Sequence, residues 1–323
     1  MKKDNKKAFP SSPRIIFMGT PDFAVPSLKS LVEHGHNVLS VITQPDKPKG
    51  RGRKMTPSPV KQLAIDYGID VLQPEKASGR EFCELIRGKE PDVIIVVAFG
   101  QILKNEFLDI PEFGAINIHA SLLPNYRGAA PVHWAVMNSE EKTGLTAMKI
   151  DENLDSGPIL LQEEVPIFSG ETAGALYERL AALSGEFLIK TLKGMAEGNI
   201  SEKAQDHAKA TYAPKIGRKM ALINWDQPAN KISALIRALD PWPGAFTTFQ
   251  GKEIKLFLSS VMDENKPDLT PGRVFGKLDE GIAVETAKGI VLVKELQMPG
   301  KKRLAAKDLL LGFQIDEGAV FGI

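Results

Sequence analysis

The chain has 323 residues, of which 43% are hydrophobic and 25% are charged, and its formal net charge is +1. This is the composition of a globular protein, and a chain of this length is expected to form two domains. The near-neutral charge excludes a protein that is basic throughout. Its single cysteine excludes an intramolecular disulfide bond, and no apolar run reaches the roughly 18 residues of a membrane helix. We therefore expect a soluble protein, located in the cytoplasm.

The first strand is expected to begin only at Arg14. Residues 1–13 are charged and lack the apolar core of a secretory signal, so they are predicted to form a disordered tail. The apolar run 14–19 then predicts a buried strand, and a helical pattern leads to a second strand at 37–43. A strand, a helix and a second strand in this order favour a parallel sheet with right-handed crossovers.

Alternating helices and strands continue to residue 207. The helical patterns lie at 59–68, 80–89, 130–139 and 171–198. Further strands are predicted at 92–99, 115–120, 145–150 and 158–167, and the very apolar strand 92–99 is expected in the middle of the sheet. Residues 14–207 are thus predicted to form an α/β domain with a parallel sheet.

The composition changes after residue 207, and residues 208–323 are predicted to form a second, strand-rich domain. One helix is expected at 230–239, and strands are expected at 245–249, 253–260, 272–276, 281–285 and 290–295. This spacing is typical of a small barrel or sandwich. The region carries 17 Lys/Arg against 13 Asp/Glu, an excess of positive charge.

A second basic segment lies between residues 43 and 60. Thr43–Val60 contains four prolines and two glycines, so we expect a loop without regular structure. Residues 44–61 carry six Lys/Arg and one acidic residue, Asp46. A basic run is often only a solvated face, but two basic regions in a near-neutral chain predict a polyanionic partner.

The strand 115–120 ends in polar residues suited to chemistry. Side chains alternate along a strand, so Asn117 and His119 share one face at its carboxyl end, where open α/β sheets bind ligands. An amide and an imidazole together can stabilise an oxyanion. The alternative is that both side chains bond only to loop backbone. Asp155 follows in the sequence D-S-G-P; it is either an ordinary turn residue or the partner that orients His119.

Several motifs in order resemble the folate-dependent formyltransferase family. They are R-I-I-F-M-G-T-P-D-F-A, Q-P-D-K-P-K-G-R-G-R-K-M-T-P-S-P-V-K, N-I-H-A-S-L-L-P-N-Y-R-G-A-A-P, D-E-N-L-D-S-G-P-I-L and D-P-W-P-G. The similarity runs from about Arg14 to about Asp308, and it is strongest to the members that act on aminoacylated initiator tRNA. One departure is Asp240, where asparagine is frequent before Pro-Trp-Pro.

The resemblance implies a Rossmann-like catalytic domain at 14–207 and an OB-like β-barrel at 208–323 that binds tRNA. It implies 10-formyltetrahydrofolate as the formyl donor and the amino group of methionine on initiator tRNA as the acceptor, in translation initiation. No metal is implied, and we expect a monomer that does not bind membranes. The catalytic residues would be Asn117, His119 and Asp155. The folate contacts would be Ser121, Leu122, Leu123 and Pro124, and the tRNA loop would use Lys47, Lys49, Arg51, Arg53 and Lys54.

Other functions remain open from the residues alone. A formyltransferase for another amine, such as a ribonucleotide or an amino-sugar nucleotide, would use the same Asn, His and Asp. The turn G-T-P-D-F after the first strand is a poor phosphate site, because it contains a proline and an acid. Formyl transfer to water is a third possibility. A non-catalytic RNA-binding protein would explain the basic loop and the β-rich domain, but not the polar end of the strand.

Overall fold

The computed structural model describes residues 7–49, 54–267 and 269–322. Contacts divide the chain into two compact units. The first contains Met1–Gly128, Gly144–Val165 and Glu178–Tyr212. The second contains Ala129–Thr143, Pro166–Tyr177 and Ala213–Ile323. The division is therefore not a single cut in the sequence, because two short segments before residue 207 belong to the second unit.

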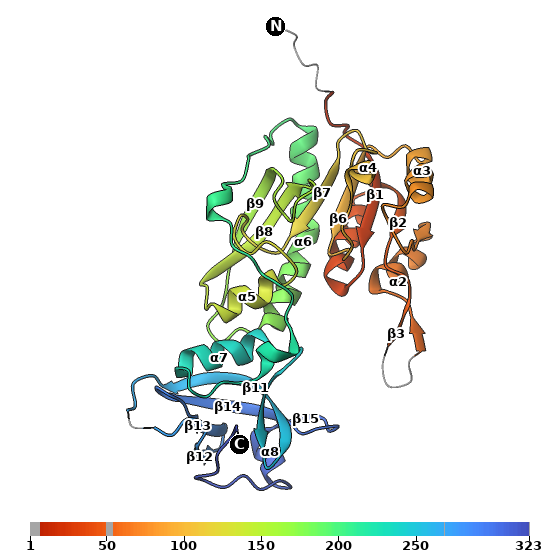
Figure 1. The fold of residues 1–323 in the computed structure, drawn as a ribbon. Helices are drawn as coiled ribbons and strands as arrows, with labels where there is room; N and C mark the ends of the chain where they lie inside the picture. The colour runs from red at the N-terminus through yellow and green to blue at the C-terminus, as the bar shows by residue number, and fades with distance from the viewer. Residues whose placement is uncertain (1–6, 50–53, 268, 323) are drawn as a thin grey trace. The chain divides into compact units, whose positions relative to one another are not determined.

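The first unit is built on a seven-stranded sheet in the order β5-β2-β1-β6-β7-β8-β9 (Figure 1). Its strands are β1 (Arg14–Gly19), β2 (Asn37–Ile42), β5 (Val71–Leu72), β6 (Val93–Val97), β7 (Ala115–His119), β8 (Lys142–Lys149) and β9 (Ile159–Pro166). The pairs from β5 to β7 are all parallel, whereas β8 runs antiparallel to β7. The predicted parallel sheet is thus confirmed for five strands, and β8 makes the whole sheet mixed.

Helices cover both faces of this sheet. They are α1 (Val25–Glu33), α2 (Pro59–Asp66), α3 (Arg80–Gly88), α4 (Asn105–Leu108) and α6 (Ala173–Ala196). The chain moves from β1 through α1 to β2, and in the opposite direction from β5 through α3 to β6. Right-handed crossovers in opposite directions place α1 and α3 on opposite faces, and the direction reverses between β1 and β6. Ligands of such sheets bind beyond the carboxyl ends of the strands at this reversal.

One face of the sheet carries a continuous apolar cluster. It contains Met18 of β1, Val96 of β6 and Ala115 of β7, together with Cys83 and Ile86 of α3. Because side chains alternate along a strand, the residues two and four positions after Ala115 lie on this same face. The apolar row along β7 therefore gives way to polar side chains toward its carboxyl end.

The prediction that residues 43–60 have no regular structure is wrong for residues 47–49 and 54–56. Strands β3 (Lys47–Lys49) and β4 (Lys54–Thr56) form an antiparallel pair, with Pro48 opposite Met55. In such a pair every second residue exchanges no ladder hydrogen bonds, so a proline without an N–H fits there. The prolines at 57 and 59 lie outside the strands, and Pro59 is the first residue of α2.

Part of the segment assigned to a disordered tail is packed in the described residues. Phe9 is buried and meets the ring of Phe113 edge-on, with the ring centroids 5.0 Å apart. Lys7 forms an exposed ion pair with Glu112. An apolar ring near the end of a charged segment is enough to fix the chain locally, because its burial is favourable.

The second unit is an antiparallel β-domain. Its strands are β10 (Ala245–Phe249), β11 (Lys252–Asp263), β12 (Val274–Leu278), β13 (Gly281–Glu285), β14 (Ile290–Gln297) and β15 (Arg303–Ala305). They form one sheet in the order β10-β11-β14-β13-β12, and β15 pairs with β14. Within residues 213–267 and 269–322, β10 and β12 do not pair with each other, so the expected OB-like barrel is not closed.

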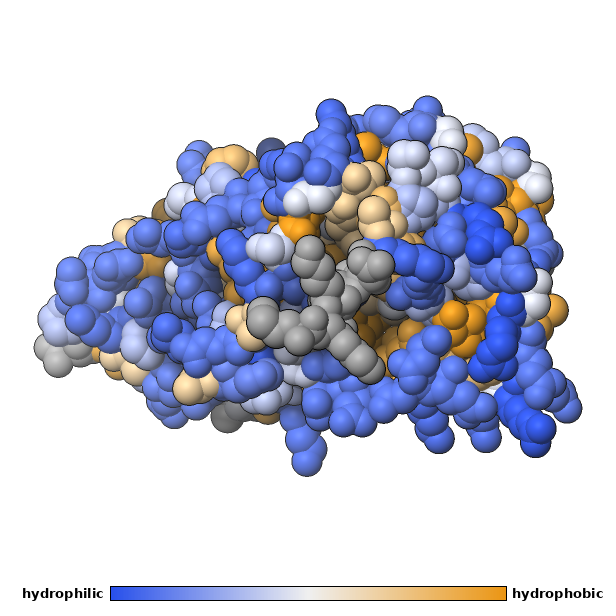
Figure 2. Space-filling view, turned by 90° about the horizontal axis from the view of Figure 1, so that it is seen from above, coloured by the Kyte–Doolittle hydropathy of each residue, from blue (hydrophilic) through white to orange (hydrophobic). Residues whose placement is uncertain are grey.

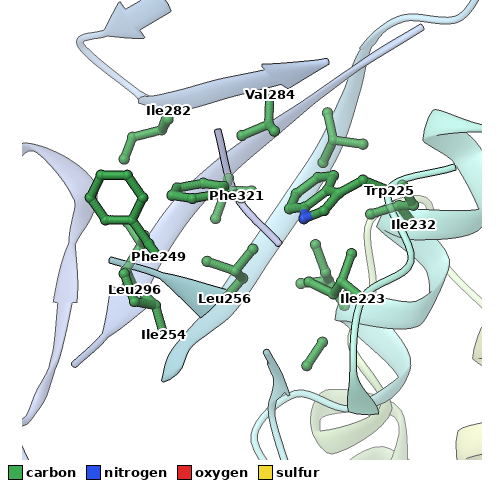
Figure 3. Packing of buried hydrophobic residues seen from close by; sticks show 14 of the residues in the cluster. Ile223, Trp225, Ile232, Phe249, Ile254, Leu256, Ile282, Val284, Leu296 and Phe321 are labelled. Carbon is green, nitrogen blue, oxygen red and sulfur yellow. The ribbon is translucent and has the colours of Figure 1, made fainter. Parts of the chain in front are cut away.

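Three aromatic rings lie among the aliphatic side chains in the core of this second unit (Figure 3). Phe249 meets Phe321 edge-on at 5.5 Å, and Trp225 lies 6.0 Å from the same ring. The indole N–H of Trp225 donates to Thr247 Oγ1 at 3.0 Å, so this buried polar group is satisfied. Helices α5 (Pro131–Met137), α7 (Ala229–Ala238) and α8 (Ala306–Leu310) complete the unit.

The face drawn in Figure 2 is mainly hydrophilic, and hydrophobic residues appear on it as patches. Among the described residues, no helix is long and apolar enough to cross a membrane.

Candidate functional site

Strand β7 presents Asn117 and His119 on the same face of the sheet. Asn117 pairs with Val96 of β6 and Met148 of β8, and His119 pairs with Thr146. Asn117 is half-buried, and its side-chain amide has no hydrogen-bond partner among the described residues. A half-buried amide without a partner at the carboxyl end of a strand is available to a ligand.

His119 is 6% exposed, and its ring has a hydrogen-bond partner on one side and a neighbouring carboxylate on the other. Its Nε2 lies 2.9 Å from the carbonyl oxygen of Tyr126, and its Nδ1 lies 3.7 Å from Oδ2 of Asp155. A carbonyl oxygen can only accept, so Nε2 carries a proton and donates it. Tyr126, rather than the expected Asp155, therefore fixes the tautomer. Asp155 lies on the other side of the ring, beside Nδ1.

Asp155 reaches His119 because the loop after β8 folds back along the sheet. Strand β8 ends at Lys149, which pairs with Ile116, whereas His119 is opposite Thr146. The loop must therefore return about 10 Å along β7, at a rise of about 3.3 Å per residue. Asp155 adopts a left-handed conformation with φ 48°, and the backbone N–H of Gly128 donates to its Oδ2 at 2.8 Å.

Gly157 permits the tight course of this loop. A Cβ atom at this position would lie 1.9 Å from the carbonyl oxygen of Lys149 and 3.0 Å from its carbon. Atoms of the backbone cannot move aside as a flexible side chain can. The D-S-G-P sequence is therefore more than an ordinary turn, because its glycine lets the loop pass close to the end of β8.

The segment expected to contact folate follows β7 directly. Ser121 and Leu123 are buried, and the Ser121 hydroxyl donates to the carbonyl oxygen of Asn125 at 2.6 Å. Thr146 Oγ1 donates to the Ser121 carbonyl at 2.6 Å, and Gln162 donates to the Leu123 carbonyl at 2.9 Å. The segment is thus rigid. Leu122 and Pro124 are half-buried and keep accessible surface.

The hairpin of β3 and β4 carries the predicted tRNA residues. Lys47 is exposed, and the backbone of Lys49 pairs with that of Lys54. Arg51 and Arg53 lie outside the described residues. Strands β2 and β7 are parallel and separated by two strands, so their carboxyl ends lie on one edge about 14 Å apart. The hairpin, which follows β2, starts at the edge that carries His119.

Hydrogen bonds fix the base of this hairpin. Thr43 Oγ1 lies 2.7 Å from Ser58 Oγ, which joins the two ends of the segment. Lys61 forms an ion pair with Asp46 at 2.7 Å, and Gln73 donates to the same carboxylate at 2.7 Å. The Lys61 ammonium and the Gln73 amide lower the pKa of Asp46 below its ordinary value. Lys61 thus has a structural partner and is not a free cation of the loop.

Sequence reasoning missed three groups that shape the site. They are the carbonyl of Tyr126, the N–H of Gly128 and the side chain of Gln205, which donates to the Asp155 carbonyl at 3.0 Å. Backbone groups leave no signal in a sequence. Gln205 is 50 residues from Asp155 in the chain, so no local pattern could have paired them. In the described part of the chain, no group of three His, Cys, Asp or Glu is placed to hold a metal ion.

Both parts of the chain match known family descriptions. The description "Formyl transferase" matches residues 13–192. The description "Formyl transferase, C-terminal domain" matches residues 215–314. Together with Asn117 and His119 on one face of the mixed sheet and Asp155 in the loop beside them, these matches define the class: the protein is a formyl-transferring enzyme with two domains.

Relatives of nearly the same length narrow the class. A methionyl-tRNA formyltransferase from Pelotomaculum thermopropionicum is 48% identical over 309 residues, which cover 96% of this chain and 98% of the relative. One from Clostridioides difficile is 44% identical over 309 residues, covering 96% of this chain and all of the relative. The chain belongs to the methionyl-tRNA formyltransferase family.

Solved structures share the fold at low sequence identity. HypX from Aquifex aeolicus in complex with tetrahydrofolic acid has a TM-score of 0.65 at 20% identity, over 95% of this chain and 49% of that one. An N-formyltransferase from Helicobacter canadensis in complex with folinic acid and dTDP-3-aminofucose has a TM-score of 0.66 at 20% identity, over 88% of this chain and 99% of that one.

Proposed function

We propose that this protein transfers the formyl group of 10-formyltetrahydrofolate to the α-amino group of methionyl initiator tRNA. The observation that carries the proposal is the constellation on β7, where the free amide of Asn117 and the imidazole of His119 share one face beside Asp155. Membership of the methionyl-tRNA formyltransferase family supports this acceptor. The folate compounds bound to neighbours of the same fold support a folate donor.

The residues of this chain suit nucleophilic transfer of an acyl group. When bound, 10-formyltetrahydrofolate supplies an electrophilic formyl carbon on N10, and the uncharged amine forms the new C–N bond there. Asn117 donates an N–H to the formyl oxygen as negative charge develops, which is the largest contribution in many acyl transfers. His119 lies beside the developing oxyanion as a second polar group, and Asp155, 3.7 Å from its Nδ1, orients the ring.

The proton balance of the transfer is met by Asp155 and the leaving group. The amine loses one proton as it becomes an amide, and the carboxylate of Asp155 accepts it through water. The bond between the formyl carbon and N10 then breaks, and N10 takes up a proton. The net transfer consumes no external acid or base.

The rigid segment 121–124 suits the donor, because its backbone is fixed while Leu122 and Pro124 keep accessible apolar surface. Pterins and benzoyl groups bind through such apolar surfaces together with a few fixed polar groups. The basic hairpin suits the acceptor, because it starts at the same edge of the sheet and carries Lys47, Lys49, Arg51, Arg53 and Lys54.

A panel of acceptors tests this function against the alternatives. The purified protein is incubated with 10-formyltetrahydrofolate, and the release of tetrahydrofolate is followed after adding one acceptor. We expect release with methionyl initiator tRNA, and none with deacylated tRNA, glycinamide ribonucleotide, an amino-sugar nucleotide or water. Faster release with another amine would contradict the tRNA acceptor, and equal release in water would show a hydrolase.

A further inference from the structure

A closed ring of hydrogen bonds joins Asp155 to Arg127 and Gln205. The carboxylate of Asp155 accepts from the N–H of Gly128 at 2.8 Å. Gln205 Nε2 donates to the carbonyl oxygen of Asp155 at 3.0 Å and to that of Gly157 at 2.8 Å. Gln205 Oε1 in turn accepts from Nη2 of Arg127 at 2.6 Å and from its Nε at 3.2 Å. The carboxylate and the backbone carbonyl of Asp155 are therefore both hydrogen-bonded. Gly128 holds the carboxylate, and Gln205, itself bonded to Arg127, holds the carbonyl.

The ring is buried, so its hydrogen bonds are shielded from water. Arg127 is 4% exposed and Gln205 is 6% exposed. Nη2 of Arg127 also donates to Nδ1 of His207 at 3.2 Å, which fixes the plane of the guanidinium. Two N–H groups of a planar guanidinium meet one amide oxygen here, an arrangement that a lysine cannot reproduce. Buried polar networks whose members are all bonded are rigid.

The segment that contains Gln205 also holds Tyr126, whose carbonyl oxygen is the hydrogen-bond partner of His119 Nε2. The carbonyl of Thr211 accepts from the N–H of Arg127 at 2.9 Å, and its hydroxyl accepts from the N–H of Tyr126 at 2.8 Å. The carbonyl of Tyr126 accepts the Nε2 proton of His119. Residues 205–211, which follow α6, thus support both groups beside the His119 ring, the carboxylate of Asp155 and the carbonyl of Tyr126.

Asp155 needs such support because of its backbone conformation. Its φ of 48° lies in the left-handed region, which is uncommon for residues other than glycine and is stabilised here by the surrounding hydrogen bonds. Gln205 bonds the carbonyls on both sides of Ser156, and so it fixes the stretch of chain that sets the direction of the carboxylate.

We propose that Gln205, held by Arg127, is a positioning residue for the transfer reaction, which keeps the carboxylate of Asp155 beside Nδ1 of His119. The inference rests on the proposed role of Asp155 in that reaction. Gln205 touches no reacting atom and acts only through the loop.

Two substitutions of Gln205 distinguish its bonds to Arg127 from its bonds to the carbonyls of Asp155 and Gly157. Gln205→Met keeps the size of the side chain and removes both its donor and its acceptor. Gln205→Glu keeps an oxygen for Arg127, but sets a second oxygen against the carbonyls of Asp155 and Gly157. We expect both variants to lower kcat by about 10- to 100-fold with little change in KM, since a misplacement of about 1 Å costs up to about 100-fold. If Gln205 only satisfies Arg127, Gln205→Glu keeps the wild-type kcat, and the proposal is overturned.

A double-mutant cycle and a matched control distinguish loss of Asp155 positioning from a general loss of stability as the cause of a lower kcat. Adding Gln205→Met to Asp155→Asn should lower kcat no further, because both changes remove the same oriented carboxylate. Losses that multiply would show that Gln205 acts independently of Asp155. The control is Ser184→Ala, which removes a buried hydrogen bond of 2.8 Å to Ser27 in the same unit. It should keep the wild-type kcat.

Nitrogen NMR of the histidine rings tests the positioning without any turnover. The ring signals of His119 are assigned by their loss in His119→Asn, and Gln205→Met should displace them in the direction seen for Asp155→Asn. Unchanged His119 signals in Gln205→Met would overturn the positioning role even in an active enzyme. A wild type that is inactive with every acceptor would instead contradict the proposed function, and the NMR result would still decide the positioning.

Discussion

Three side chains and the backbone around them define the site at the scale of residues. The periodicity of two along β7 was sufficient to predict that Asn117 and His119 share a face, because alternation is a property of every strand. The place of Asp155 depends on a loop that folds back over the sheet, so the residues alone left its role open and the resemblance to a family favoured the partner of His119. The tautomer of His119 depends on the carbonyl of Tyr126, which no sequence pattern reveals.

Loss of any one of the three side chains should remove most of the activity. We expect Asn117→Ala, His119→Ala and Asp155→Asn each to lower kcat for formyl transfer by at least about 100-fold, the scale of one lost oxyanion donor. Binding of tetrahydrofolate, measured by calorimetry, should persist, because the segment 121–124 is held by Thr146 and Gln162. A variant with near-normal kcat would show that its residue has no part in the reaction.

A methyl group at position 157 should disturb the site without touching the three side chains. In Gly157→Ala the new Cβ would lie 1.9 Å from the carbonyl of Lys149, so the loop with Asp155 must move. We expect kcat to fall by at least about 10-fold, since a small displacement is costly in catalysis. Gly88→Ala, whose Cβ would meet nothing within 4 Å and whose φ is not positive, is the comparison for a glycine with open space. Equal kcat in both variants would mean that the loop tolerates the change.

The hairpin of β3 and β4 is the element that differs most from expectation. Its prolines and glycines predicted a loop, but one proline fits between ladder hydrogen bonds and the rest lie outside the strands. The hydrogen bonds at the base of the hairpin were equally hard to predict, because Asp46 is bound by Gln73, 27 residues further along the chain. Helices and strands with clear periodicity were predicted well, whereas the short elements β5, α4 and β15 have too few residues to show a pattern.

The hairpin should contribute to tRNA binding and not to folate binding. We expect Arg51→Ala to raise KM for charged initiator tRNA, because a guanidinium can bind phosphate through two N–H groups. The Kd for tetrahydrofolate should stay at the wild-type value. Limited proteolysis at Lys49–Lys54 should become slower when tRNA is added. Cleavage that is equally fast with and without tRNA would contradict contact between the hairpin and the tRNA.

At the scale of the whole molecule, positive charge is concentrated in two regions of a nearly neutral chain. Residues 208–323 carry 17 Lys/Arg against 13 Asp/Glu. We expect the affinity of the full chain for initiator tRNA to fall as salt is added, because phosphate contacts release counterions. Lys301→Ala with Lys302→Ala, two exposed positions, should reduce the slope of log K against log salt by up to about 2. An unchanged slope would show that this part of the second unit does not contact the nucleic acid.

The most direct measurement follows one labelled atom. The wild type and Asp155→Asn are given 10-formyltetrahydrofolate labelled with carbon-13 in the formyl group, together with methionyl initiator tRNA, and methionine is recovered from the tRNA for mass spectrometry. We expect the label on the α-amino group of methionine with the wild type, at a rate at least about 100-fold above that of Asp155→Asn. Absence of the label from methionine, or equal rates for the two proteins, would contradict it.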